Sequence, residues 1–210
     1  MAVEAKTKEQ LIQEFRVQTI RDAAARVIAR KGLDGATMQA IADAAGIAKG
    51  TIYLYFQNRG ELLERTADHA FSQLLDEVLG ILAAPGPLPE RLHRLIAAQI
   101  SYFDERRDFF RLYLSVRYPE GASEASRRER KTWEQHKVYV ERLTVFFEEA
   151  VARGEIRPMD AARLALFVSE GVIAILIRRL AEAESVPVAE DVDWLAETIL
   201  HGIALPEEEP

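Results

Sequence analysis

Five neighbouring residues in the first third of the chain have the side-chain chemistry that nucleic acids bind. Lys49 carries a positive charge, Thr51, Tyr53 and Tyr55 carry hydroxyl groups, and Gly50 lets the backbone approach a partner closely. DNA phosphates and base edges accept contacts of these kinds. The same residues also suit an ordinary corner between two helices with tyrosines on its surface. Their chemistry alone leaves both interpretations open.

Other residues have catalytic potential, but their spacing forms no catalytic or metal site. Glu90 and His93 have the spacing used in carboxylate-bridged metal bundles, which need a second such pair, and the chain has none. The sequence contains no cysteine, His-Glu-x-x-His motif, phosphate-binding loop or dinucleotide-binding glycine pattern. Ser101, Ser115 and Ser169 lack the glycines of a nucleophile elbow. We therefore expect no enzyme activity, metal site or cofactor.

Two short helices must position Lys49 and its neighbours. Thr37 can cap the first helix through its hydroxyl, and apolar residues follow it at helical spacing. These residues are Met38, Ile41, Ala42 and Ala45. Gly46 supplies a left-handed turn that a larger side chain would resist, and a second helix opens near Ala48 or Lys49. The pattern predicts a helix-turn-helix corner.

Charge is distributed unevenly along the chain. The net charge is −7, but residues 1–65 carry +2, which leaves −9 for residues 66–210. Because phosphate binding is largely electrostatic, only the first third suits DNA. The N-terminus has no apolar signal segment, and the most apolar run, residues 171–177, is too short to span a membrane. We expect a cytoplasmic protein that does not enter membranes.

Helical periodicity dominates the sequence and predicts an all-α protein of about nine helices. The first helix is expected over residues 9–30, ending at Gly32. Its predicted apolar stripe contains Ile12, Phe15, Ile20, Ala23, Ala24, Val27 and Ile28. Residues 80–88 form the clearest linker-like break, although the preceding helix continues from the first module.

The segment around the corner resembles a known family at many fixed positions. The matching residues are Thr37, Ile41, Ala42, Ala45, Gly46, Ile47, Gly50, Thr51, Ile52, Tyr53, Tyr55, Phe56, Asn58, Arg59, Glu61, Leu62 and Leu63. Together with the helix before them, they are similar to the signature of the TetR (tetracycline-repressor-like) family of one-component transcriptional regulators. The resemblance covers residues from about 10 to 65. Beyond them it extends only to length, helicity and the start of the penultimate helix.

The resemblance implies an N-terminal three-helix DNA-binding domain over residues 1–60 and a helical ligand-binding and dimerisation domain over residues 61–210. By position, the residues facing base edges in the major groove are Gln39, Lys49, Gly50 and Leu54. The residues at phosphate-contacting positions are Thr37, Thr51, Tyr53, Tyr55 and Arg59. Gly60 departs from the family pattern, and Leu54 offers only an apolar contact, such as one with a thymine methyl group.

A homodimer on two-fold symmetric, double-stranded operator DNA is also implied. We expect its interface in the last two long helices, the first of which is apolar on more than one face. The apolar residues of these helices are Leu164, Phe167, Val168, Gly171, Val172, Ile175, Leu176 and Leu180, then Val192, Leu195, Ala196, Ile199 and Ile203. Burial of the first of these helices within its own chain is the alternative.

The C-terminal domain is expected to bind an effector of unknown identity. The candidate lining residues are Tyr102, Phe103, Phe110, Tyr113, Trp133, His136, Tyr139, Phe167 and Glu170. An ordinary aromatic core is the alternative for each of them. Glu170 suits a cationic effector, a nearby arginine or solvent. Arg127, Arg128, Arg130 and Lys131 suit an anionic effector such as an acyl-coenzyme A, or a solvated helix start.

The sequence therefore predicts a ligand-responsive DNA-binding regulator, specifically a repressor that a small, largely apolar effector releases from its operator. For release, the effector must bind the DNA-free state more tightly than the DNA-bound state. The alternative is a helical small-molecule-binding or interaction module that binds no operator.

Overall fold

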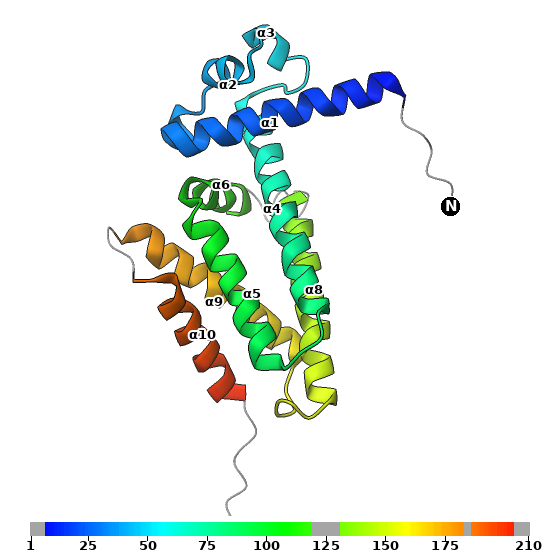
Figure 1. Cartoon of the computed structure of the whole chain (residues 1–210), viewed down its shortest axis with the longest axis vertical. Coiled ribbons are helices and arrows are strands. Elements are labelled where there is room, and N and C mark those ends of the chain that lie inside the picture. Colours follow the sequence, from blue (N-terminus) through cyan, green and yellow to red (C-terminus); the bar gives the residue numbers. More distant parts are fainter. Residues whose placement is uncertain (1–6, 119–130, 183–185, 204–210) are drawn as a thin grey trace, which may run out of the picture. The chain divides into compact units, whose positions relative to one another are not determined.

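The computed structural model describes residues 7–118, 131–182 and 186–203. In these residues every regular element is a helix, which confirms the predicted all-α class (Figure 1). The chain forms two compact units. The first comprises Met1–Ala70 and Asp108–Glu120, and the second comprises Phe71–Arg107 and Gly121–Pro210.

The first unit contains α1 (Lys8–Gly35), α2 (Met38–Ala45), α3 (Lys49–Ile52), the beginning of α4 (Arg59–Ala83) and nearly all of α6 (Arg107–Arg117). In this unit α2 contacts both α1 and α3 (Figure 1). Apolar side chains from each helix, α3 and α6 included, form its core. The core includes Ile20, Ala24, Ile28, Ile41, Ala42, Ile52, Phe56, Leu62 and Leu112.

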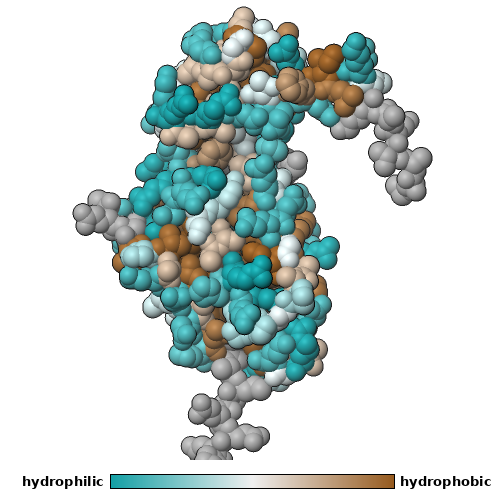
Figure 2. Space-filling model, in the orientation of Figure 1, coloured by the Kyte–Doolittle hydropathy of each residue, from teal (hydrophilic) through white to brown (hydrophobic). Residues whose placement is uncertain are grey.

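Helix α1 begins well before its first buried residue. A reciprocal capping box between Thr7 and Gln10 starts the helix, and Gly32 interrupts it with φ of 71°, where the sequence predicts its end. The first buried residue is Ile20. Ile12 and Phe15, expected in the buried stripe, are 51% and 69% exposed. That expectation was wrong because this part of α1 extends beyond the core, where it carries an apolar surface patch (Figure 2).

The second unit contains the rest of α4, then α5 (Leu88–Asp104), α8 (Lys131–Ala152), α9 (Ala161–Ala181) and α10 (Val188–Ile203). Helix α9 contacts α8, α5 and α10, and α10 also contacts α5. Because α9 has three neighbours, many of its side chains are buried. Among them are Leu164, Ala165, Val168, Val172, Ile175 and Leu176.

A buried ion-pair network joins three helices of the second unit. Arg179 on α9 is 3% exposed, and its Nε donates to Asp104 on α5 at 3.0 Å. Its Nη1 donates to Asp191 on α10 at 2.6 Å and to the Val186 carbonyl at 2.8 Å. Arg178 also donates to Asp191. The network therefore fixes the end of α9 against α5 and the start of α10.

The compact units divide the chain differently from the predicted boundary after residue 60. Helix α4 contributes residues to both units, and Asp108–Glu120 return to the first. The predicted linker at residues 80–88 is instead the end of α4, a short loop and the start of α5, all within the second unit. Contacts distant in sequence set these limits, so local composition does not indicate them.

Candidate nucleic-acid interface

Helix α2 is held at both ends by interactions that its sequence predicts. The Thr37 Oγ1 accepts a hydrogen bond from the Ala40 N–H at 3.1 Å, which satisfies a free donor at the helix start. Gly46 has φ of 67°, and its N–H bonds to the carbonyls of Ala42 and Asp43. The Ile47 N–H reaches the Ala42 carbonyl at 3.1 Å. This left-handed ending directs the chain into α3.

Helix α3 is a single short turn that two buried side chains anchor. Ile52 and Phe56 are 0% and 1% exposed, and the Arg65 guanidinium lies 5.0 Å from the centre of the Phe56 ring. After Ile52 the chain continues as a turn through Tyr53, Leu54 and Tyr55. The anchors fix the orientation of the opposite face of this segment.

That opposite face brings together most of the residues predicted to contact DNA. Lys49 and Gly50 are exposed, as is Gln39 on α2. Tyr53 is 48% exposed and Leu54 is 79% exposed. Thr51 is half-buried, and Tyr55, also half-buried, packs against the core. The surface offers a cation, hydroxyl groups, an amide and an apolar side chain.

Arg59 has a role that sequence reasoning missed. Its Nε donates to the Ala36 carbonyl at 2.9 Å, and its Nη2 donates to the Leu33 carbonyl at 2.5 Å. The guanidinium therefore binds the backbone that connects α1 to α2. No pattern of side chains could have indicated this contact, because both acceptors are backbone groups. A phosphate contact by the other donors of Arg59 stays a prediction.

The start of α4 supports this position of Arg59. The Asn58 Oδ1 accepts the Glu61 N–H at 2.9 Å, and the Glu61 Oε2 accepts the Gln57 N–H at 2.7 Å. This reciprocal arrangement caps the helix and fixes the residues on either side of Arg59.

Two glycines of the corner have different roles, which gives a testable contrast. Alanine at Gly46 should lower the free energy of unfolding by about 1 kcal/mol, because its φ is positive. A Cβ atom at Gly50 meets no atom within 4 Å, so alanine there should leave stability unchanged or slightly raised. Urea unfolding of both variants checks this contrast. Equal losses of stability would contradict it, whereas the predicted contrast indicates that the fold does not require glycine at position 50.

The candidate effector residues do not form one group. Phe103, His136 and Tyr139 are buried in the second unit, whereas Phe110 and Tyr113 are buried in the first. Tyr102 lines a groove of about 690 Å³ between α4 and α5. Burial raises the pKa of Tyr102. Glu170 is half-exposed, with its Oε1 3.7 Å from the His136 Nε2. The Trp133 side chain and residues 127–130 lie outside the described parts.

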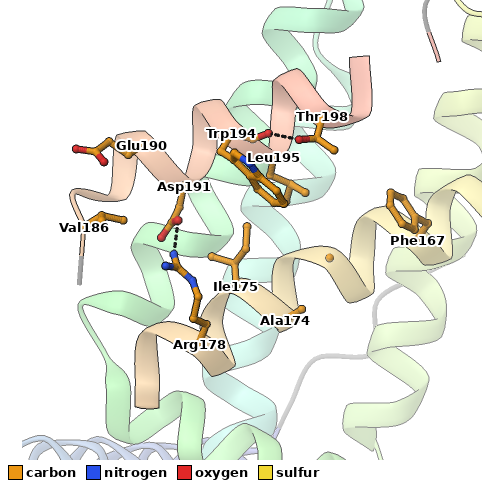
Figure 3. Close-up of a pocket in the computed structure, with 11 residues that line it drawn as sticks. Phe167, Ala174, Ile175, Arg178, Val186, Glu190, Asp191, Trp194, Leu195 and Thr198 are labelled. Atoms are coloured by element: carbon orange, nitrogen blue, oxygen red, sulfur yellow. Dashed lines mark hydrogen bonds and ion pairs between the residues drawn. The ribbon is translucent and has the colours of Figure 1, made fainter. Parts of the chain in front are cut away.

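Phe167 instead lines a cavity of about 630 Å³ between α9 and α10 (Figure 3). Phe167 and Trp194 are 60% and 62% exposed on its two sides. Ile175 and Leu195 also line the cavity, and the ion pair of Arg178 with Asp191 lies at one end (Figure 3). A second cavity of about 480 Å³ shares Phe167 and Thr198 and continues toward the start of α9. Together these cavities form an apolar groove along α9 and α10.

Comparison with known proteins identifies the corner. Residues 20–66 match the family described as bacterial regulatory proteins, tetR family. They contain the second part of α1, all of α2 and α3, and the start of α4. This part of the chain is similar to that family's DNA-binding segment. The predicted family resemblance is therefore confirmed.

One curated relative matches part of this chain. The chain is 30% identical over 131 residues to the uncharacterized HTH-type transcriptional regulator YerO of Bacillus subtilis (strain 168), covering 61% of this chain and 45% of YerO. The chain thus spans less than half the length of this curated relative.

Solved structures are similar over nearly the whole chain. The regulator FadR from Bacillus subtilis in complex with stearoyl-CoA is 23% identical, with a TM-score of 0.72, covering 89% of this chain and 98% of FadR. A TetR/AcrR-family regulator from Thermobifida fusca is 24% identical, with a TM-score of 0.72, covering 90% of this chain and 98% of that one. These likenesses show the fold.

In the described residues, every helix is too short or too polar to cross a lipid bilayer. The same residues contain no group of three acidic or histidine side chains that could hold a metal ion.

Proposed function

We propose that this protein is a DNA-binding transcriptional repressor that a small, largely apolar effector releases from its operator. The observation that carries the proposal is the exposed face of the α2–α3 corner. There Gln39, Lys49 and Leu54 project from a corner held by Thr37, Gly46 and the buried anchors of α3. The naming of relatives such as YerO as HTH-type transcriptional regulators supports it.

The proposed contacts fall into two groups. Gln39, Lys49, Gly50 and Leu54 face base edges, and the exposed leucine offers its methyl groups to a thymine methyl. The main phosphate contacts come from the hydroxyl groups of Thr37, Thr51, Tyr53 and Tyr55. Arg59 contributes mainly by holding the α1–α2 connection, and its further donors contact phosphate. A glycine at position 50 keeps the surface open, so the backbone of α3 can approach the bases.

Fluorescence anisotropy with labelled duplexes from the DNA flanking the gene tests this function. The proposal predicts saturable binding to one duplex, competed poorly by unrelated DNA and weakened steeply as salt rises, because phosphate contacts release counterions. Equal, weak binding to every duplex would instead support the alternative, a helical ligand-binding or interaction module without operator binding.

We further propose that two copies associate through the apolar groove along α9 and α10. Phe167 and Trp194 present large exposed aromatic surfaces there, and aromatic side chains are enriched in interfaces between subunits. In a two-fold dimer the same groove is used by both copies, so each would cover the aromatic residues of the other. Such a dimer presents two corners to a symmetric operator.

Aspartate at Phe167 should separate the subunits, because it would bury a charge in the proposed interface. Leu166→Asp is the matched control, since Leu166 is 50% exposed on the same helix but does not line the groove. Sedimentation velocity at micromolar concentration should show dimers for the native chain and for Leu166→Asp, and monomers for Phe167→Asp. A native species near 23.7 kDa would contradict the interface.

Effector binding would act through the helices that connect the two units. Helix α4 contributes residues to both, so a ligand that shifts its C-terminal half can change the first unit. The solved structure of FadR with stearoyl-CoA supports an effector with a long apolar part. Release requires that the effector prefer the DNA-free arrangement.

A further inference from the structure

A line of polar side chains crosses the second unit from its surface to its interior. It comprises Glu170 on α9, His136 and Tyr139 on α8, and Gln99 on α5, and is called here the polar cluster. Glu170 is half-exposed, whereas His136, Tyr139 and Gln99 are 6%, 4% and 9% exposed. Interiors built from apolar helices rarely hold several polar groups without a structural or functional need.

Tyr139 is the member whose polar group the chain leaves unused. Its hydroxyl is buried, and among the described residues no group meets it with hydrogen-bond geometry, although the Gln99 amide is close enough to lower its pKa. The Gln99 amide lies nearby but donates its own N–H to the Leu95 carbonyl at 3.1 Å. A buried hydroxyl without a partner reduces stability, and a ligand group that accepts its hydrogen would remove that cost.

The other end of the cluster is already engaged within the chain. The His136 Nε2 lies 3.7 Å from the Glu170 Oε1, and the His136 ring meets the Tyr139 ring edge-on at 6.2 Å between centroids. The cluster therefore has a charged end that is half-exposed and a neutral end that is buried at Tyr139 and Gln99.

We propose that Tyr139 binds the polar head of the effector, and that this head is an uncharged hydrogen-bond acceptor such as an ester or ketone carbonyl. This inference rests on the proposed function and specifies the chemical class of its ligand. A charged head of either sign would lose its hydration at the depth of Tyr139, where the nearby groups are a hydroxyl and an amide.

The protonation of Tyr139 agrees with this role. Burial raises its pKa, and the nearby Gln99 lowers it by less. The hydroxyl is therefore neutral and keeps the hydrogen that it would donate to a carbonyl oxygen. Entry requires α8 to separate from α5 or α9, so a ligand that occupies the site stabilises an arrangement different from the empty one.

Three probes with one apolar tail and different heads test the proposal: methyl decanoate, decanoate and decyltrimethylammonium, each used below micelle-forming concentrations. Binding to the full chain is measured by calorimetry and by the shift in Tm. Methyl decanoate should bind best. Tyr139→Phe should weaken its binding about 3- to 10-fold. The free variant should have a Tm no lower than that of the native chain, because the hydroxyl has no partner to lose.

Tyr102→Phe is the matched control, because Tyr102 lies in the α4–α5 groove and its substitution should leave binding unchanged. Preferred binding of decanoate or of the cation, no binding of any probe, or unchanged binding to Tyr139→Phe would each overturn the proposal. If the chain binds operator DNA but gives one of these results, this inference is wrong and the proposed repressor function is not affected. If the chain binds methyl decanoate through Tyr139 but binds no DNA, the proposed repressor function is wrong and this inference is not affected.

Discussion

Replacing Lys49 and Tyr53 together by alanine should lower operator affinity at least about 100-fold while leaving the fold intact. Both side chains are exposed on the α2–α3 face. Contacts to phosphates and base edges each contribute about 1–3 kcal/mol, and 1.4 kcal/mol corresponds to a factor of ten. Fluorescence anisotropy with the tightest-binding duplex measures the loss, and urea unfolding checks the fold.

The matched control for this pair is Lys137→Ala, which removes one positive charge from an exposed position on α8. It tests whether affinity follows the chain's total charge or the particular surface. We expect operator affinity close to that of the native chain. An equal loss in both variants would mean that the α2–α3 face is not the reading surface, even though its residues lie together.

The largest effect on stability is expected at Arg179. Replacing it by methionine keeps the apolar part of the side chain but leaves Asp104 and the buried Asp191 without their shared guanidinium. Breaking a buried ion pair by removing one partner costs about 3–5 kcal/mol. Urea unfolding at neutral pH should show a loss of this size.

Arg153→Met provides the comparison for Arg179, because Arg153 also binds two carboxylates, those of Glu149 and Glu155. Its guanidinium is exposed, so water can replace both interactions. We expect the midpoint of urea unfolding to stay close to the native value. A similar shift in both variants would show that burial is not what makes the Arg179 network important.

The Arg179 network should also make stability depend on acid pH. The hydrogen bond from Arg179 lowers the pKa of Asp104, against the opposing effect of burial. Its stabilising contribution is therefore present above the unfolded-state pKa of about 4 and is lost as pH falls through the lower folded-state value. Urea unfolding from pH 7 to pH 3 should show this loss, and Asp104→Asn should make the curve flatter. An unchanged slope in the variant would rule out Asp104 as its source.

The parts of the structure that local signals determine were predictable from the sequence. Thr37 caps α2, Gly46 adopts the left-handed turn and Gly32 interrupts α1, all as the residue types indicate. Each depends on backbone conformation within a few residues. The helix-turn-helix and the all-α class followed from these signals and from helical periodicity.

Features that depend on distant contacts were not predictable. Helical spacing alone cannot show that Ile12 and Phe15 lie beyond the core, or that Phe110 and Tyr113 belong to the first unit. The contact of Arg59 with backbone carbonyls leaves no pattern in the sequence. An apolar helix such as α9 also looks the same whether its residues are buried, as Val168 is, or line a surface groove, as Phe167 does.

Selection of duplexes from a random pool by the full chain tests the central claim most directly, because it requires no knowledge of the operator. The repressor predicts enrichment of a two-fold symmetric sequence that binds two copies of the chain, with enrichment lost in the Lys49→Ala, Tyr53→Ala variant. Recovery of no common sequence, or of the same sequence by the variant, would contradict DNA recognition through the α2–α3 corner.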